Sequence, residues 1–205
     1  MSTGAARHVQ RCISLGVACI LVAMLVGCTG RGGGQLPPNP ALMFMGAASF
    51  GFTFSCEDSS PNLNSPTGQL RIQLAYTDQG SNPLGSKFSI HGIVDTLDPV
   101  QESMICIGQN PPPGGNELIF LGRYRLRSSP PAGFPASCPA TKTVTTPMCR
   151  FEVIVRDNDK NGAPSMGDYF SIKLSSATAL GSQLDPQTVI YARAGLLRSG
   201  NLTVK

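Results

Sequence analysis

The sequence predicts an all-β fold, built as a single antiparallel β-sandwich of about seven or eight strands, with a small closed β-barrel as the alternative. Short segments in which apolar and polar residues alternate recur along the chain, and turn-forming Gly, Pro, Asn and Asp separate them. No window of useful length has helical periodicity. The 17 prolines gather between these segments, where proline removes no hydrogen bond from a strand ladder.

Eight segments carry the two-residue period of half-buried strands. In the first, Phe50, Phe52 and Phe54 alternate with Gly51 and Thr53. In chain order the segments are 50–54, 70–76, 88–94, 117–126, 151–155, 170–174, 188–193 and 202–204. We expect them to follow one another up and down the sheet.

The fifth and sixth segments predict a hairpin with an acidic connecting loop. This loop places Asp157, Asp159, Asn161, Ser165 and Asp168 at positions 1, 3, 5, 9 and 12 of a calcium-binding loop. Two interpretations stay open, a calcium site with these five ligands or a turn in which Asp and Asn bond nearby backbone. The flanking strands, the proline inside the loop and the short last carboxylate favour the turn.

The N-terminus predicts export. Arg7 and Arg11 precede an apolar run over 12–24, and Leu-Val-Gly-Cys at 25–28 resembles the lipobox of bacterial lipoproteins. We therefore expect a lipoprotein signal peptide over 1–27 and acylation of Cys28, which would hold the protein at the cell membrane or cell surface. An ordinary signal peptide or signal anchor is the alternative.

Residues 28–41 predict a flexible tether, because three glycines in a row precede a proline pair without any apolar period. A single β-domain would then occupy 42–205. The formal charge of the whole chain is +4, and 16 basic residues less Arg7 and Arg11 leave 14 against 12 acidic ones. The cations are scattered singly along the chain, which together with export argues against a nucleic-acid partner.

Seven cysteines predict two disulfides, since two leave with the signal peptide and one takes the lipid. Cys138 and Cys149 bracket a short Thr-rich segment, so we pair them with each other and Cys56 with Cys106. An up-and-down strand order supports this choice by placing each pair at one end of the sheet. Zinc is not expected, because Cys-x-x-Cys is absent and His91 is the one histidine beyond the signal peptide.

Five runs of sequence resemble a bacterial extracellular β-module found at the ends of secreted and surface proteins. They are GQLRIQLAYTDQG, FSIHGIVDTLDP, FLGRYR, FEVIVRDND with GDYFSIKL, and LLRSGNLTVK. The matching strand and turn positions are Gly68, Leu70, Tyr76, Asp78, His91, Gly92, Val94, Asp157, Asn158, Gly167, Asp168, Phe170, Ile172, Gly200 and Asn201. Two long insertions depart from the pattern. The resemblance, over residues 50–204, implies an accessory β-sandwich without catalytic residues.

No arrangement of residues predicts an enzyme. His91 lies on the polar face of its strand, and neither a Gly-x-Ser-x-Gly elbow nor a nucleotide-binding glycine loop is present. We expect a non-enzymatic envelope module that contacts the membrane through its anchor and binds polysaccharide, lipid or protein. The alternatives are a carrier of an apolar ligand and a calcium-stabilised adhesion module; a hydrolase is disfavoured. No cofactor other than calcium is expected.

Overall fold

The computed structural model describes residues 28–57, 69–93, 115–138, 148–158, 167–177 and 184–205. These residues form nine β-strands and two single turns of 3-10 helix, η1 (Pro40–Leu42) and η2 (Pro186–Thr188). The strands are β1 (Cys28–Leu36), β2 (Ala48–Glu57), β3 (Gln69–Asp78), β4 (Phe88–Ile93), β5 (Glu117–Leu126), β6 (Arg150–Arg156), β7 (Tyr169–Ser175), β8 (Val189–Leu196) and β9 (Ser199–Val204). Neither helical turn in these ranges has the length or hydropathy to cross a membrane.

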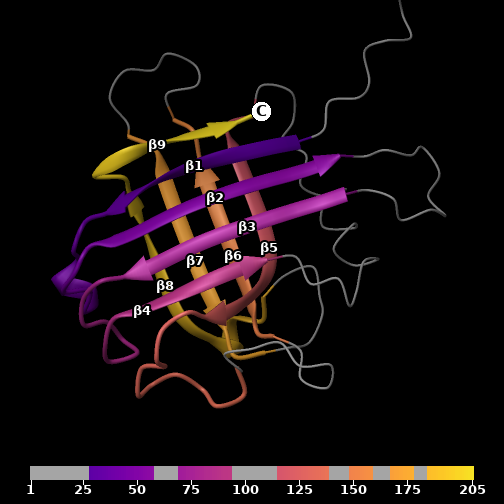
Figure 1. Ribbon diagram of the computed structural model, residues 1–205. Coiled ribbons are helices and arrows are strands. Elements are labelled where there is room, and N and C mark those ends of the chain that lie inside the picture. Colours follow the sequence, from indigo (N-terminus) through magenta and orange to yellow (C-terminus); the bar gives the residue numbers. More distant parts are fainter. Residues whose placement is uncertain (1–27, 58–68, 94–114, 139–147, 159–166, 178–183) are drawn as a thin grey trace, which may run out of the picture.

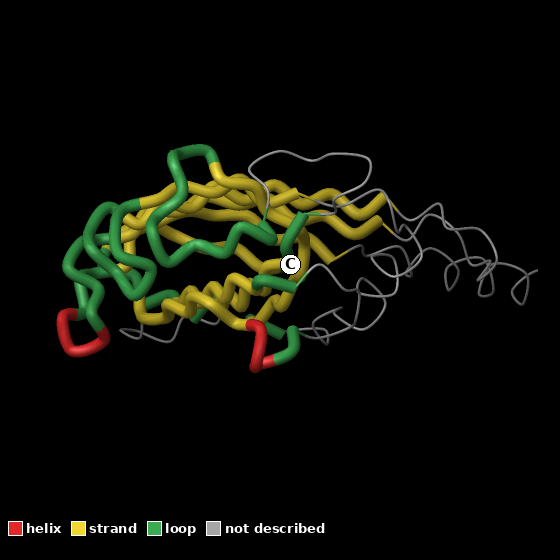
Figure 2. Tube along the Cα trace, turned by 90° about the horizontal axis from the view of Figure 1, so that it is seen from below, coloured by secondary structure: helices red, strands yellow, loops and turns green. Residues whose placement is uncertain are grey.

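All nine strands belong to one antiparallel sheet in the order β8-β7-β6-β5-β4-β3-β2-β1-β9. From β2 to β8 each strand pairs with the next one along the chain, and β9 then returns to pair with β1. The sheet curls, so that β9 and β1–β4 cross steeply over β5–β8 (Figure 1). Seen from below, the two halves form two facing layers (Figure 2).

The prediction of an all-β antiparallel fold is confirmed, and the expected meander holds from β2 to β8. The eight predicted segments lie in β2 to β9, except that residue 94 is outside the described ranges and Thr188 belongs to η2. The predicted hairpin forms, with Phe151 opposite Leu174 and Val155 opposite Phe170. Two details differ: the strands number nine in the described residues, and they join into one curled half-barrel instead of two separate sheets.

The predicted tether is wrong for residues 28–36, which form β1 between β2 and β9. Its glycines permit close packing: a Cβ at Gly32 would lie 2.5 Å from the Asn201 carbonyl oxygen, and one at Gly30 would lie 2.4 Å from Cδ2 of Leu118. Glycine in a strand marks such close approaches as well as flexible linkers. The β-domain therefore begins at residue 28 or before, not at 42.

The core lies between the two halves of the curled sheet and is rich in aromatic rings. Phe50 of β2 stacks on Phe170 of β7 with ring centroids 3.6 Å apart, while Phe52 and Phe54 lie 5.4 and 5.5 Å from Phe120 of β5. Full burial of each such side chain contributes about 2–3 kcal/mol to stability. These contacts pack β2, in the half of the sheet formed by β9 and β1–β4, against β5 and β7 in the other half.

The predicted Cys138–Cys149 disulfide is present, with Cα atoms 5.2 Å apart and both residues buried. It ties the segment before β6 to the loop after β5. Closing a loop of this size in the unfolded chain corresponds to about 3 kcal/mol of stabilisation. Cys56 lies at the end of β2, but its predicted partner Cys106 falls outside the described residues.

Candidate functional site

An exposed apolar loop between β1 and β2 is the strongest candidate for a functional site. Leu42, Met43 and Met45 keep 58%, 60% and 59% of their surface exposed, whereas Phe44 between them is 3% exposed. We call these three exposed residues the tip. Exposed apolar side chains that gather in one place commonly mark interaction sites in soluble domains.

The tip has a fixed backbone. Asn39 and Phe44 exchange both backbone hydrogen bonds, at 2.8 and 3.0 Å, and the Met43 N–H donates to the Pro40 carbonyl. Met43 lies in the left-handed region, with φ 63° and ψ 19°, although it is not glycine. A side chain in that region costs about 1–2 kcal/mol, so the surrounding contacts must hold it there.

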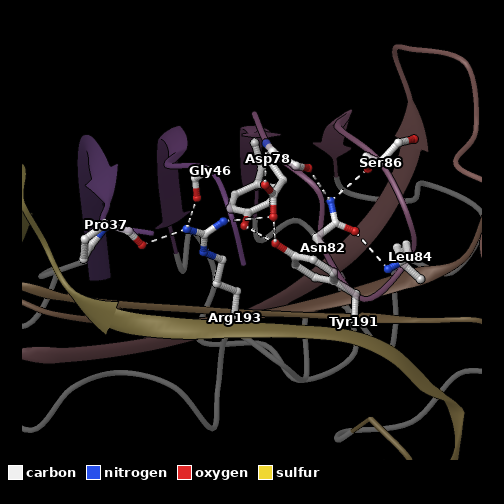
Figure 3. A network of polar contacts seen from close by, with 10 residues as sticks. Pro37, Gly46, Asp78, Asn82, Leu84, Ser86, Tyr191 and Arg193 are labelled. Atoms are coloured by element: carbon white, nitrogen blue, oxygen red, sulfur yellow. Dashed lines mark hydrogen bonds and ion pairs between the residues drawn. The ribbon is translucent and has the colours of Figure 1, made fainter. Parts of the chain in front are cut away.

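A buried ion pair provides that hold, and we call it the clamp. The Arg193 guanidinium of β8 donates from Nη1 to Asp78 Oδ2 of β3 at 2.9 Å. From Nη2 it donates at 2.8 Å to the carbonyl oxygens of both Pro37 and Gly46 (Figure 3). Because Pro37 and Gly46 are the two stems of the tip loop, one guanidinium fixes both ends.

Two tyrosines extend the hydrogen-bond network around the Asp78 carboxylate. The Tyr191 hydroxyl donates to Asp78 Oδ2 at 2.7 Å and also shares a hydrogen bond with the Tyr76 hydroxyl. The other carboxylate oxygen accepts from the Gly80 N–H at 3.2 Å. Burial raises the pKa of both Tyr76 and Tyr191 far above the ordinary tyrosine value, so both remain protonated. Every oxygen of the Asp78 carboxylate therefore has a donor.

The clamp also anchors the buried member of the tip loop. The Arg193 guanidinium lies 4.7 Å from the centroid of the Phe44 ring, a cation–π distance. Tyr191 meets the same ring edge to face at 5.7 Å. Phe44 is thus drawn inward, which turns its neighbours Met43 and Met45 outward.

A second loop, between β3 and β4, supports the tip from the side. The Asn82 side chain donates to the carbonyls of Gly80 and Ser86 and accepts from the Leu84 N–H (Figure 3). The Met45 N–H donates to the Ser81 carbonyl at 2.9 Å. The tip loop is therefore held both by Arg193 and by the loop between β3 and β4.

The structure describes two of the predicted calcium ligands, Asp157 and Asp168, and both accept hydrogen bonds from backbone N–H groups. Asp157 Oδ2 accepts from the Val204 N–H at 3.1 Å, and Asp168 Oδ2 accepts from the Leu202 N–H at 2.7 Å. Asp168 Oδ1 also accepts from the Asn158 N–H. Both carboxylates are buried. They satisfy backbone donors on the outer edge of β9, a task that a neighbouring strand would otherwise perform.

The remaining predicted ligands, Asp159, Asn161 and Ser165, lie outside the described residues. Within the described ranges, no group of three or more His, Cys, Asp or Glu side chains is placed to hold a metal ion. Cys28, the predicted acylation site, is the first residue of β1 and lies opposite Cys56 in the strand register.

The sequence indicated neither the tip, which precedes the first predicted strand, nor the clamp, whose two charged residues lie far apart in the chain. Two signals were available. Residues 32–56 contain no charged residue, although they include the run Leu42–Met45. Asp78 and Arg193 also fall in phase with buried residues of their strands, two positions after Tyr76 and Tyr191. A charge in the buried phase of a strand indicates a buried partner.

Comparison with known proteins gives no relative from which a function could be transferred: no family model, curated protein or solved structure matches this chain.

Proposed function

We propose that this protein is an exported, lipid-anchored, non-enzymatic binding module that docks its apolar tip into a pocket of a partner protein. The observation that carries the proposal is the exposure of three large apolar side chains on a loop whose stems are fixed by a buried ion pair. Because the loop is already ordered in the free protein, binding loses less conformational entropy. Methionine side chains adapt to irregular apolar pockets, which suits such a tip.

A protein partner fits the tip better than a lipid surface or a polysaccharide. The absence of charge from residue 32 to residue 56 removes the cationic contribution on which attachment to anionic lipid depends. Leu42 and the two methionines offer no hydrogen-bonding group to sugar hydroxyls. An apolar pocket would instead desolvate all three side chains together, as binding hot spots do.

The expected anchor and the tip lie at opposite ends of β1. Cys28 begins the strand and Leu36 ends it next to Pro37, a stem of the tip loop. Nine residues of strand span about 30 Å at 3.3 Å per residue. An acyl chain on Cys28 would therefore attach to the folded sheet without a linker, and the tip would be displayed at the far end.

The ring contacts between the two halves of the sheet favour this proposal over a carrier of an apolar ligand. Phe50, Phe170, Tyr76 and Tyr191 meet across the interior and belong to one continuous cluster of buried residues. A carrier needs space at that position for its ligand. A hydrolase gains no support from His91, whose ring lies beside Arg125 on the outer face of β4.

Photo-crosslinking tests the docking role of the tip. A photoreactive amino acid at Met45 should give one discrete adduct in intact cells, whereas the same group at exposed Ala192 on β8 should not. Adding Leu42→Ser should lower the Met45 adduct about tenfold, because up to about 1.4 kcal/mol of apolar burial is lost. Thermal unfolding of Leu42→Ser should match that of the wild type. Equal adducts at Met45 and Ala192 would contradict the proposal.

Cell fractionation tests the anchor separately. We expect Cys28→Ser to move the protein from the membrane fraction to the soluble fraction, because the thiol that takes the acyl chain is gone. Circular dichroism of the variant should show an unchanged β-sheet spectrum, because the substitution replaces a single atom of the side chain. Continued membrane retention of a folded Cys28→Ser protein would rule out anchoring through this residue.

A further inference from the structure

The outer face of β9 and β1–β4 differs in chemistry from the rest of the surface. Its outward side chains are mainly hydroxyls, amides and cations. The strand register places Arg31, Thr53 and Gln73 in one row across β1, β2 and β3. Gln35, Ser49 and Thr77 form a parallel row. The face is therefore polar and rich in hydrogen-bonding groups.

Cations gather at the β4–β5 side of this face. His91 lies opposite Arg125 in the register, and the His91 Nδ1 is 3.5 Å from an Arg125 guanidinium nitrogen. The Arg127 N–H donates to the Ser89 carbonyl, which continues the ladder and places Arg127 on the same face as Arg125. Both arginines are exposed. We call His91, Arg125 and Arg127 the cationic face.

The acidic side chains that the structure describes lie elsewhere. Glu117 pairs with Arg156 and Glu152 with Lys173, all on strands of the other half of the sheet. Asp78, Asp157 and Asp168 are buried. Among the side chains that the structure describes, no carboxylate lies on the outer face of β9 and β1–β4.

The pKa of His91 reflects its burial and the positive charges around it. Partial burial, followed by the charges of Arg125 and Arg127, lowers the pKa of the His91 imidazole below its ordinary value. Protonation of His91, which would add a positive charge beside the two arginines, is thus disfavoured. An anion bound between His91 and the two arginines would reverse the effect and raise the pKa, since an opposite charge stabilises the imidazolium.

We propose that the cationic face binds an anionic polysaccharide whose acidic groups meet Arg125, Arg127 and His91 while its hydroxyls meet the Ser, Thr and Gln rows. Arginine guanidinium groups recognise carboxylate and phosphate through paired hydrogen bonds. The face has no exposed aromatic side chain for stacking nucleic-acid bases. It also lacks a large exposed apolar side chain for insertion into lipid. This inference does not depend on the tip.

Binding of polygalacturonate, a carboxylated polysaccharide, to the purified protein tests the proposal. We expect measurable affinity that weakens with salt, and a loss of about tenfold or more in Arg125→Gln/Arg127→Gln. Arg156→Gln is the matched control, because it removes an exposed arginine from the other half of the sheet and should bind normally. Uncharged dextran should not bind.

Proton NMR of the imidazole gives an independent readout. The chain has two histidines, and the His91→Gln variant identifies the signal of His91 against that of His8. Saturating polygalacturonate should raise the pKa of His91, and affinity should consequently increase as the pH falls through that range. Failure of polygalacturonate to bind, equal binding by dextran, or binding of phosphatidylglycerol vesicles in its place would each overturn the proposal.

Discussion

Replacement of Arg193 by methionine is expected to lower the free energy of unfolding by about 3–5 kcal/mol, because it leaves a fully buried carboxylate without its cation. Asp78 is 0% exposed, and Arg193 is the cation that donates to its carboxylate, at 2.9 Å. Chemical unfolding of the purified protein in urea measures the loss. Arg156→Met, which breaks an exposed pair with Glu117, should change stability by no more than about 0.5 kcal/mol.

A double variant separates the effect of the buried charges on stability from the effect of side-chain volume. Asp78→Asn/Arg193→Met removes both charges and keeps similar volumes, so it should recover at least half of the stability that Arg193→Met loses. The amide at position 78 would keep one oxygen as acceptor for the Gly80 N–H, and its NH2 group would donate to the Tyr191 hydroxyl. If Arg193→Met alone lost less than about 1 kcal/mol, Asp78 and Arg193 would not form the buried pair described above.

Substitution of Gly32 by alanine should destabilise the fold by about 2–3 kcal/mol, since overpacking of this kind forces strands apart. The added Cβ would lie 2.5 Å from the Asn201 carbonyl oxygen and 2.9 Å from the Cα of Leu202, and both of these atoms belong to the backbone of β9. Backbone on two paired strands cannot yield as a flexible side chain can. Thermal unfolding gives the measurement.

The matched control for this substitution is Gly51→Ala on the neighbouring strand. A Cβ at Gly51 would meet nothing nearer than the Gly32 carbonyl oxygen at 3.9 Å, so the variant should stay within about 0.5 kcal/mol of the wild type. A flexible tether would tolerate alanine at position 32 as easily as at position 51. Equal stability of the two variants would therefore contradict the placement of β1 in the sheet.

Much of the fold could be predicted from the sequence because alternation is a local property. In β2, β3 and β7 the apolar residues recur at every second position, and each of these strands forms where the alternation lies. The Cys138–Cys149 bridge could be predicted for the same reason, since its loop is short. Residues that interact within a few positions leave a pattern that one sequence displays.

β1 could not be recognised in this way. Gly32 and Gly34 are explained by the backbone of β9, some 170 residues later in the chain, Gly30 by Leu118, and Gly33 by the Phe50 carbonyl of β2. Consecutive glycines without that partner have the composition of a linker. The return of β9 to β1, which joins the last strand of the chain to the first, likewise leaves no local pattern in the sequence.

The candidate sites depended still more on distant residues. Asp78 and Arg193 are 115 positions apart, so their pairing leaves only the indirect signal of a charge in a buried phase. Asp157 and Asp168 match a calcium loop in spacing, yet the described contacts direct both carboxylates to β9. The cations of the outer face look scattered in the sequence, and strand pairing brings them together.

Hydrogen exchange in the tip loop tests the central claim most directly, namely that the clamp holds the tip in the conformation that binds. The amide protons of Phe44 and Met45 are hydrogen-bonded to Asn39 and Ser81. In Asp78→Asn/Arg193→Met, we expect both to exchange at least about tenfold faster relative to a core amide such as Val153, because the stems of the loop are released. Unchanged relative protection would show that the tip is ordered without the clamp and would contradict the account.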